Sequence, residues 1–90
     1  MALDADTIKK DFPIFDRTID GKPIVYLDSA NSTQKPRQVI EAMASFMRVH
    51  YAPINRSAYR MAAESTEYFE GARTKVQRFI NAPKAHELIF

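Results

Sequence analysis

Hydrophobic residues recur at helical spacing in the middle and second half of the chain. Between residues 36 and 50 they are three and four positions apart, which predicts an amphipathic helix with one apolar face. The positions on this face are Val39, Ile40, Met43, Phe46, Met47 and His50. The same periodicity predicts a longer helix from about Ser57 to Ile80, which Asn81 and Pro83 should end. Its charged residues, Arg73 among them, lie mostly off its apolar stripe, which consists of Ala62, Thr66, Phe69, Ala72, Val76 and Phe79.

The N-terminal part of the chain predicts a short helix and then extended segments. Asp4 or Asp6 can cap a helix that Pro13 ends. The pair Asp20-Gly21 is typical of a tight hairpin turn. We therefore expect a strand of residues 24–27 to follow it, buried and paired with residues 14–19.

Three features predict that the chain is a fragment of a longer protein. The helix predicted over 57–80 would span on the order of 35 Å, more than the roughly 31 Å diameter of a compact 90-residue globule. The predicted strand at 24–27 lacks neighbours, because two strands do not make a stable sheet alone. Residues 87–90 begin what we expect to be a further strand, and the last three of them, Leu88-Ile89-Phe90, are apolar.

Composition narrows the class of protein. Ninety residues, 46% hydrophobic and 27% charged, suit one small globular domain of marginal stability. The absence of cysteine excludes a disulfide and a thiolate nucleophile within these residues. The basic residues are scattered and the net charge is only +2, so we expect no nucleic-acid binding. No apolar run reaches the roughly 20 residues that span a bilayer, and no signal or transit peptide is evident, so we expect a cytoplasmic protein.

The most informative segment runs from Tyr26 to Pro36, where an apolar strand leads into a polar turn and then a helix that begins with proline. Loops of this kind often carry ligand sites. The alternative is that Asp28 and Ser29 only close the strand as a side-chain-bonded turn. His50 is expected to be a packing residue, and His86 has no metal-ligand spacing, so neither predicts a metal site.

Several short motifs together resemble the N-terminal portion of SufS-type cysteine desulfurases, which belong to the class V aminotransferase group of pyridoxal-phosphate enzymes. The motifs are Asp11-Phe12-Pro13, Asp20-Gly21-Lys22-Pro23, Tyr26-Leu27-Asp28-Ser29-Ala30, Gln34-Lys35-Pro36, Asn55-Arg56, Glu64-Ser65-Thr66, Tyr68 through Arg73, and Phe79-Ile80-Asn81-Ala82. The resemblance covers essentially the whole chain. Selenocysteine lyases share most of the pattern.

The resemblance implies an α/β protein, the N-terminal segment of a fold type I pyridoxal-phosphate-dependent transferase. The segment itself would be mainly α-helical, with three helices and one or two short strands. Residues 1–35 would form an arm, a hairpin and a substrate-side loop, residues 36–81 two amphipathic helices leading toward the large domain, and residues 82–90 the start of a strand. The full enzyme would be a cytoplasmic homodimer.

The implied reaction converts L-cysteine to L-alanine, with the sulfur transferred to an enzyme cysteine as a persulfide and then to a Suf-type acceptor protein for iron–sulfur cluster assembly. In the family the pyridoxal-phosphate lysine, the cofactor-binding residues and the persulfide cysteine all follow the position of Phe90. We therefore assign no catalytic, cofactor-binding or metal-binding residue within 1–90, and expect the 90 residues alone to be inactive and without cofactor.

The resemblance assigns three candidate substrate-binding residues to this chain. Ala30 and Asn31 match the family's strand-end loop, where backbone N–H groups can meet the substrate carboxylate. Arg56 matches an arginine near the active site at the subunit boundary, where a guanidinium can pair with a carboxylate. Asn55 departs from the pattern, since relatives often have histidine there. Two alternatives remain, a selenocysteine lyase or other class V aminotransferase-like enzyme, and a free-standing helical interaction module without catalysis.

Overall fold

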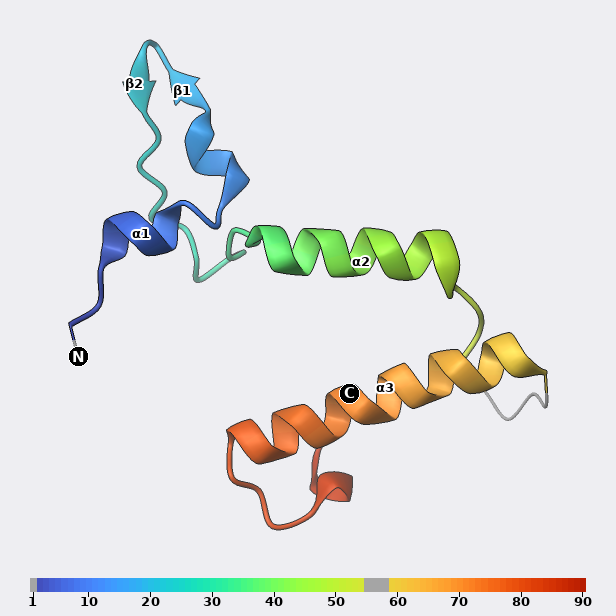
Figure 1. Cartoon of the computed structure of the whole chain (residues 1–90). Helices are drawn as coiled ribbons and strands as arrows, with labels where there is room; N and C mark the ends of the chain where they lie inside the picture. The colour runs from blue at the N-terminus through green and yellow to red at the C-terminus, as the bar shows by residue number, and fades with distance from the viewer. Residues whose placement is uncertain (1, 55–58) are drawn as a thin grey trace. The chain divides into compact units, whose positions relative to one another are not determined.

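The computed structural model describes residues 2–54 and 59–90, and the chain divides into two compact units, Met1–Ser45 and Phe46–Phe90 (Figure 1). The elements are α1 (Ala5–Lys9), the 3-10 helix η1 (Pro13–Asp16), strands β1 (Thr18–Ile19) and β2 (Lys22–Pro23), helices α2 (Arg37–Val49) and α3 (Arg60–Phe79), and the 3-10 helix η2 (Ala85–Glu87). Three α-helices and one two-stranded sheet in the described residues agree with the predicted mainly helical segment.

Helix α1 begins as the sequence predicts, with Asp4 as its N-cap. The Asp4 carboxylate accepts hydrogen bonds from the backbone N–H groups of Asp6 and Thr7 and from the Thr7 hydroxyl. The bond from the Thr7 hydroxyl, with the backbone bonds, holds the pKa of Asp4 below its ordinary value. The helix ends at Lys9, and η1 starts at Pro13, where the missing N–H costs nothing.

Two bonds join the start of α2 to the loop after α1. The Arg37 backbone N–H donates to the Asp11 carbonyl at 2.6 Å. The Arg37 guanidinium also lies 3.2 Å from the Asp11 carboxylate. Because both side chains are half exposed, the ion pair itself contributes little, and the backbone bond fixes where α2 begins. The predicted helix over residues 36–50 is confirmed as Arg37–Val49.

The hairpin turn is confirmed, but the strand predicted after it is wrong. Asp20 (φ 53°) and Gly21 (φ 73°) both adopt positive φ, as a two-residue hairpin loop with type I′ geometry requires. The antiparallel strands pair Ile19 with Lys22 and then stop at Pro23. Residues 24–27 pair with no strand in the described part of the chain. The sheet there consists of β1 and β2 alone, and no further strand lies beside residues 24–27 to bond with their N–H and C=O groups.

Helix α3 ends in the left-handed residue that the sequence predicts. Asn81 has φ 58°, its N–H donates to the Arg78 carbonyl, and the Ala82 N–H donates to the Gln77 carbonyl. These two bonds form a Schellman motif, which satisfies the last carbonyls of the helix. The Gln77 side chain adds a third bond, to the Ala82 carbonyl at 2.6 Å.

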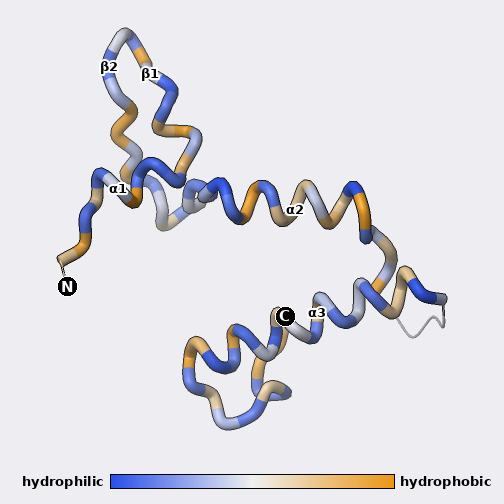
Figure 2. Tube along the Cα trace, in the orientation of Figure 1, coloured by the Kyte–Doolittle hydropathy of each residue, from blue (hydrophilic) through white to orange (hydrophobic). Residues whose placement is uncertain are grey.

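The helices expose apolar side chains that the described residues do not cover. Figure 2 shows hydrophobic residues recurring along α2, where Met43 is 57% and Met47 is 59% exposed. The chain exposes 7996 Å² in all. Two separate compact 45-residue globules would together expose only about 6,500 Å². The excess does not depend on how the units are arranged, and together they bury less surface than two stable domains of this size do.

We expect the 90-residue chain in isolation to be partly helical without a cooperative thermal transition. Asp4 caps the start of α1 and the Schellman motif closes the end of α3. Cooperativity, however, requires a packed core that the exposed apolar side chains do not form. Circular dichroism should give a helical spectrum at 5 °C and a broad, nearly linear loss of signal on heating. A sharp sigmoidal melt that is independent of chain concentration would contradict this expectation.

Candidate functional site

The turn between residues 28 and 33 is held almost entirely by its own hydrogen bonds. The Asp28 carbonyl accepts from the backbone N–H groups of Asn31 (3.0 Å) and Ser32 (3.2 Å). The Asp28 carboxylate accepts from the Asn31 amide at 2.9 Å. The half-buried Tyr26 donates its hydroxyl proton to the Ser32 carbonyl, which ties the residues before the turn to its far side. The backbone therefore has a defined conformation although the turn is exposed.

Of the two predicted N–H donors in this turn, one is already used. The Asn31 N–H donates to Asp28, so it is not available to a ligand in this conformation. The Ala30 N–H has no acceptor among residues 2–54 and 59–90, and Ala30 is exposed. Of the two predicted donors, only the Ala30 N–H is therefore free to meet an anionic group. The third predicted residue, Arg56, and its neighbour Asn55 lie outside the described residues.

A second group of polar side chains surrounds His50 at the end of α2. Its ring lies 5.1 Å from the ring of Tyr68 and 6.5 Å from that of Phe46, and its carbonyl accepts from the buried Ser65 hydroxyl at 3.1 Å. His50 Nδ1 is buried without a hydrogen bond, 3.6 Å from the Glu64 carboxylate. An open hollow of about 420 Å³ is lined by His50, Glu64, Glu67 and Tyr68. The dominant contacts are aromatic, as expected for a packing histidine.

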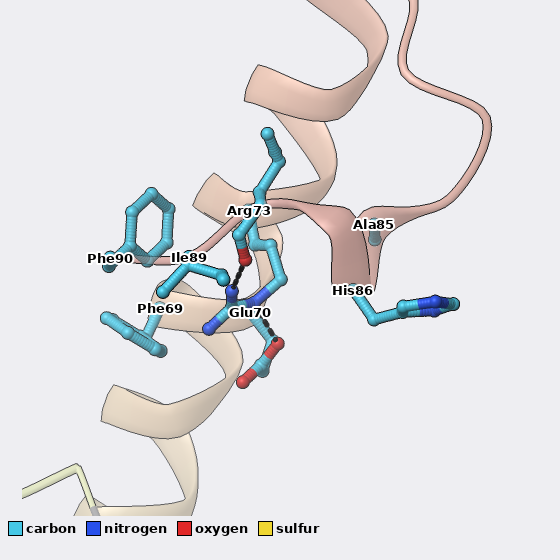
Figure 3. A pocket seen from close by; sticks show the side chains of 8 residues that line it. Phe69, Glu70, Arg73, Ala85, His86, Ile89 and Phe90 are labelled. Carbon is cyan, nitrogen blue, oxygen red and sulfur yellow. Dashed lines mark hydrogen bonds and ion pairs between the residues drawn. The ribbon is translucent and has the colours of Figure 1, made fainter.

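A second hollow, of about 510 Å³, lies where the C-terminal residues pack on α3 (Figure 3). The Arg73 guanidinium lies 5.3 Å from the ring of Phe69 and 4.8 Å from that of Phe90. It donates to the Leu88 carbonyl, and its Nε lies 3.1 Å from the Glu70 carboxylate. Arg73 is only 19% exposed, and these contacts hold the last residues on the helix.

The pattern of hydrophobic residues did not identify Arg73 as a central residue of the second unit. Its charge placed it on the polar side of α3, whereas Phe79, on the predicted apolar face, is 90% exposed. A usable signal was present in the four-residue spacing of Phe69 and Arg73, which puts a cation over an aromatic ring on one helix face. The contact with Phe90 depends on the chain folding back and could not be predicted. The strand expected at residues 87–90 has no partner in the described part of the chain.

None of the six lysines has, among the described residues, the surroundings of a lysine that forms a Schiff base. A lysine that forms a Schiff base is activated by desolvation or by a neighbouring cation. All six lysines, Lys9, Lys10, Lys22, Lys35, Lys75 and Lys84, are exposed. Within 2–54 and 59–90 there is also no group of three His, Asp or Glu side chains placed to hold a metal ion, and no helix long and apolar enough to cross a membrane.

Comparison with known proteins identifies the family. Residues 25–90 match the family described as aminotransferase class-V, so the chain belongs to the class-V aminotransferases. Among curated proteins it is 48% identical over 89 residues to a probable cysteine desulfurase of Streptomyces coelicolor, and 44% identical over 90 residues to the cysteine desulfurase of Salmonella newport. These alignments cover 98% and 100% of this chain. The chain spans only about a fifth of either relative, 21% and 22%.

In the longer protein that contains these residues, Arg73→Met should lower the free energy of unfolding by about 1–3 kcal/mol, the sum expected for two ring contacts and a hydrogen bond to a carbonyl. Arg73→Lys should lower the free energy of unfolding less than Arg73→Met does, because lysine keeps the positive charge. Some loss should remain, because lysine lacks the planar guanidinium. Arg78→Met, at an exposed position of the same helix, is the matched control. Equilibrium urea unfolding measures the differences, and equal losses at positions 73 and 78 would contradict the role of Arg73.

Proposed function

We propose that the chain is the N-terminal part of a SufS-type cysteine desulfurase. Such an enzyme breaks the carbon–sulfur bond of L-cysteine, releases L-alanine and leaves the sulfur on an enzyme thiol as a persulfide. The observation that carries the proposal is the 44–48% identity, over 98–100% of this chain, to proteins named cysteine desulfurase. Since residues 1–90 contain no cysteine, the sulfur-accepting thiol belongs to the remainder of the protein.

In this proposal the turn at residues 28–33 binds one end of the substrate. The Ala30 N–H would donate to the L-cysteine carboxylate, while the bonds between Asp28 and Asn31 hold the turn in shape. One such bond contributes on the order of 1 kcal/mol, or more to a charged acceptor, which is too little to bind a small amino acid alone. A second, charged partner is needed, and Arg56 is the residue that we propose for it.

Pyridoxal phosphate is the cofactor that we propose for the full protein, where it would supply the electron sink for reaction at the substrate's α-carbon. In this proposal the residues that hold it belong to the rest of the protein, which agrees with the lack of any lysine desolvated by the described residues. The contribution of residues 1–90 is limited to binding and orienting the substrate. We further propose a cytoplasmic homodimer that passes sulfur to a Suf-type acceptor protein for iron–sulfur cluster assembly.

A selenocysteine lyase is the alternative within the same family, because it would require the same carboxylate-binding turn. A free-standing interaction module is disfavoured, since a module that folds alone would not leave about 1,500 Å² more surface exposed than two compact globules of its size.

The full-length protein, loaded with pyridoxal phosphate, should release sulfide from L-cysteine in the presence of a reductant and form alanine in equal amount. L-selenocysteine is the comparison substrate that separates the alternatives. A kcat/KM that favours L-cysteine, together with a persulfide detected by mass spectrometry, supports the desulfurase. Turnover of L-selenocysteine but not of L-cysteine would establish the lyase. Turnover of neither substrate would contradict the proposal.

Substitutions of Asn31 separate its backbone from its side chain. Asn31→Ala leaves the turn's N–H groups in place and should raise KM for L-cysteine less than about threefold. Asn31→Asp sets a carboxylate against Asp28 and near the bound substrate carboxylate, so KM should rise about tenfold or more, with a smaller change in kcat.

Gln38→Glu, on the exposed start of α2, adds the same charge away from the turn and serves as the control for that experiment. Its KM should remain near that of the unsubstituted enzyme. If all three variants give the same KM, the turn does not contact the substrate carboxylate.

A further inference from the structure

Helix α2 has an apolar arc too wide for a helix that packs on one side only. At 100° per residue, the apolar positions run without a polar interruption from Val49 through Phe46 to Ile40, an arc of about 180°. The charged residues, Arg37, Glu41 and Arg48, share the opposite side. A helix on a protein surface needs an apolar stripe little more than about 100° wide. The sequence of α2 therefore implies packing against two separate surfaces.

The structure accounts for one of these surfaces. Phe46 is half buried, and its ring makes edge contacts with Tyr68 at 5.8 Å and with Tyr51 at 6.2 Å. The next part of the arc carries Ile40, Met43 and Met47, which we call the outer face of α2. These side chains are 46%, 57% and 59% exposed, and none of them is buried by a described residue of its own unit.

We propose that the outer face of α2 is covered by residues of the same polypeptide that follow Phe90, and not by a second copy of the chain. The inference rests on the proposed function, in which this chain is part of a longer enzyme. Since 90 residues make up 22% of a relative, that enzyme has about 400 residues. A chain of that length buries roughly 50,000 Å² on folding, whereas a homodimer interface buries about 2,000–5,000 Å². The subunit's own fold thus buries at least roughly ten times more surface than the dimer interface does, which favours the subunit as the cover of this helix face.

The chemistry of the face agrees with an occupant from the protein interior. It contains no charged side chain, and its two methionines are flexible enough to fill an irregular packed surface. The occupant should therefore be an apolar helix or sheet face. A charged or solvated segment would leave the polar groups of that segment without partners.

The test is thiol labelling of the full-length protein. Met43→Cys and Ile40→Cys place a thiol on the outer face, and Glu41→Cys places one on the polar side of the same helix. Maleimide modification of each peptide is followed by mass spectrometry, in native buffer and in denaturant. We expect native labelling at positions 40 and 43 to be at least about tenfold slower than in denaturant, and labelling at position 41 to be similar in both.

The oligomeric state separates the two occupants. Cover from the same subunit requires that protection at position 43 be independent of protein concentration, and persist in a dilute sample that light scattering shows to be monomeric. Protection that disappears on dilution would assign the face to a second copy and overturn the proposal. Labelling at position 43 as fast as at position 41 would show that nothing covers the outer face of α2, and this result would also overturn the proposal.

Activity measured on the same preparations keeps this inference distinct from the proposed function. Protected cysteines in a protein without desulfurase activity would refute the function and leave the packing intact. An active enzyme with a freely labelled Cys at position 43 would refute the packing only.

Discussion

The shortage of covering surface for the apolar faces of α2 and α3 determines most properties of this chain. Only Ala52, Ala62 and Ser65 are buried among the described residues, and all three are small. Burial of large apolar side chains is the main favourable term in folding, at about 25 cal/mol per Å². With Met43, Met47 and Phe79 in solvent, that term is largely missing here. Local bonds define each element, and tertiary stability has to come from further polypeptide.

Local signals in the sequence predicted the structure well because their causes lie within a few residues. Asp4 caps α1 by bonding to N–H groups two and three positions away. The Asp20-Gly21 pair forms its turn because aspartate tolerates, and glycine favours, a positive φ. Asn81 ends α3 by the same conformational tolerance. The fold type I family could likewise be identified from short motifs, and the match over residues 25–90 agrees with it.

The errors concern features that depend on distant residues. Residues 24–27 have the composition of a strand, but a strand exists only beside another strand, and the described chain offers none. Phe79 lies on the predicted apolar stripe and is nevertheless exposed, while the charged Arg73 is enclosed by Phe69 and Phe90. At the candidate site, the sequence located the turn, but the distinction between the Ala30 and Asn31 N–H groups required the bonding pattern around the Asp28 carbonyl.

The same lack of burial explains why we propose that these residues bind the substrate while the reacting groups lie in the rest of the enzyme. A lysine or cysteine becomes a good nucleophile when its surroundings shift its pKa, through desolvation or a neighbouring charge held at fixed distance. The described residues, in which only three small side chains are buried, do not by themselves desolvate any such group. They can hold a backbone N–H in a defined direction, because a hydrogen-bonded turn such as 28–33 needs no core. A segment of this kind is therefore suited to orient a substrate carboxylate, while the groups that react with the substrate need the larger body of the protein around them.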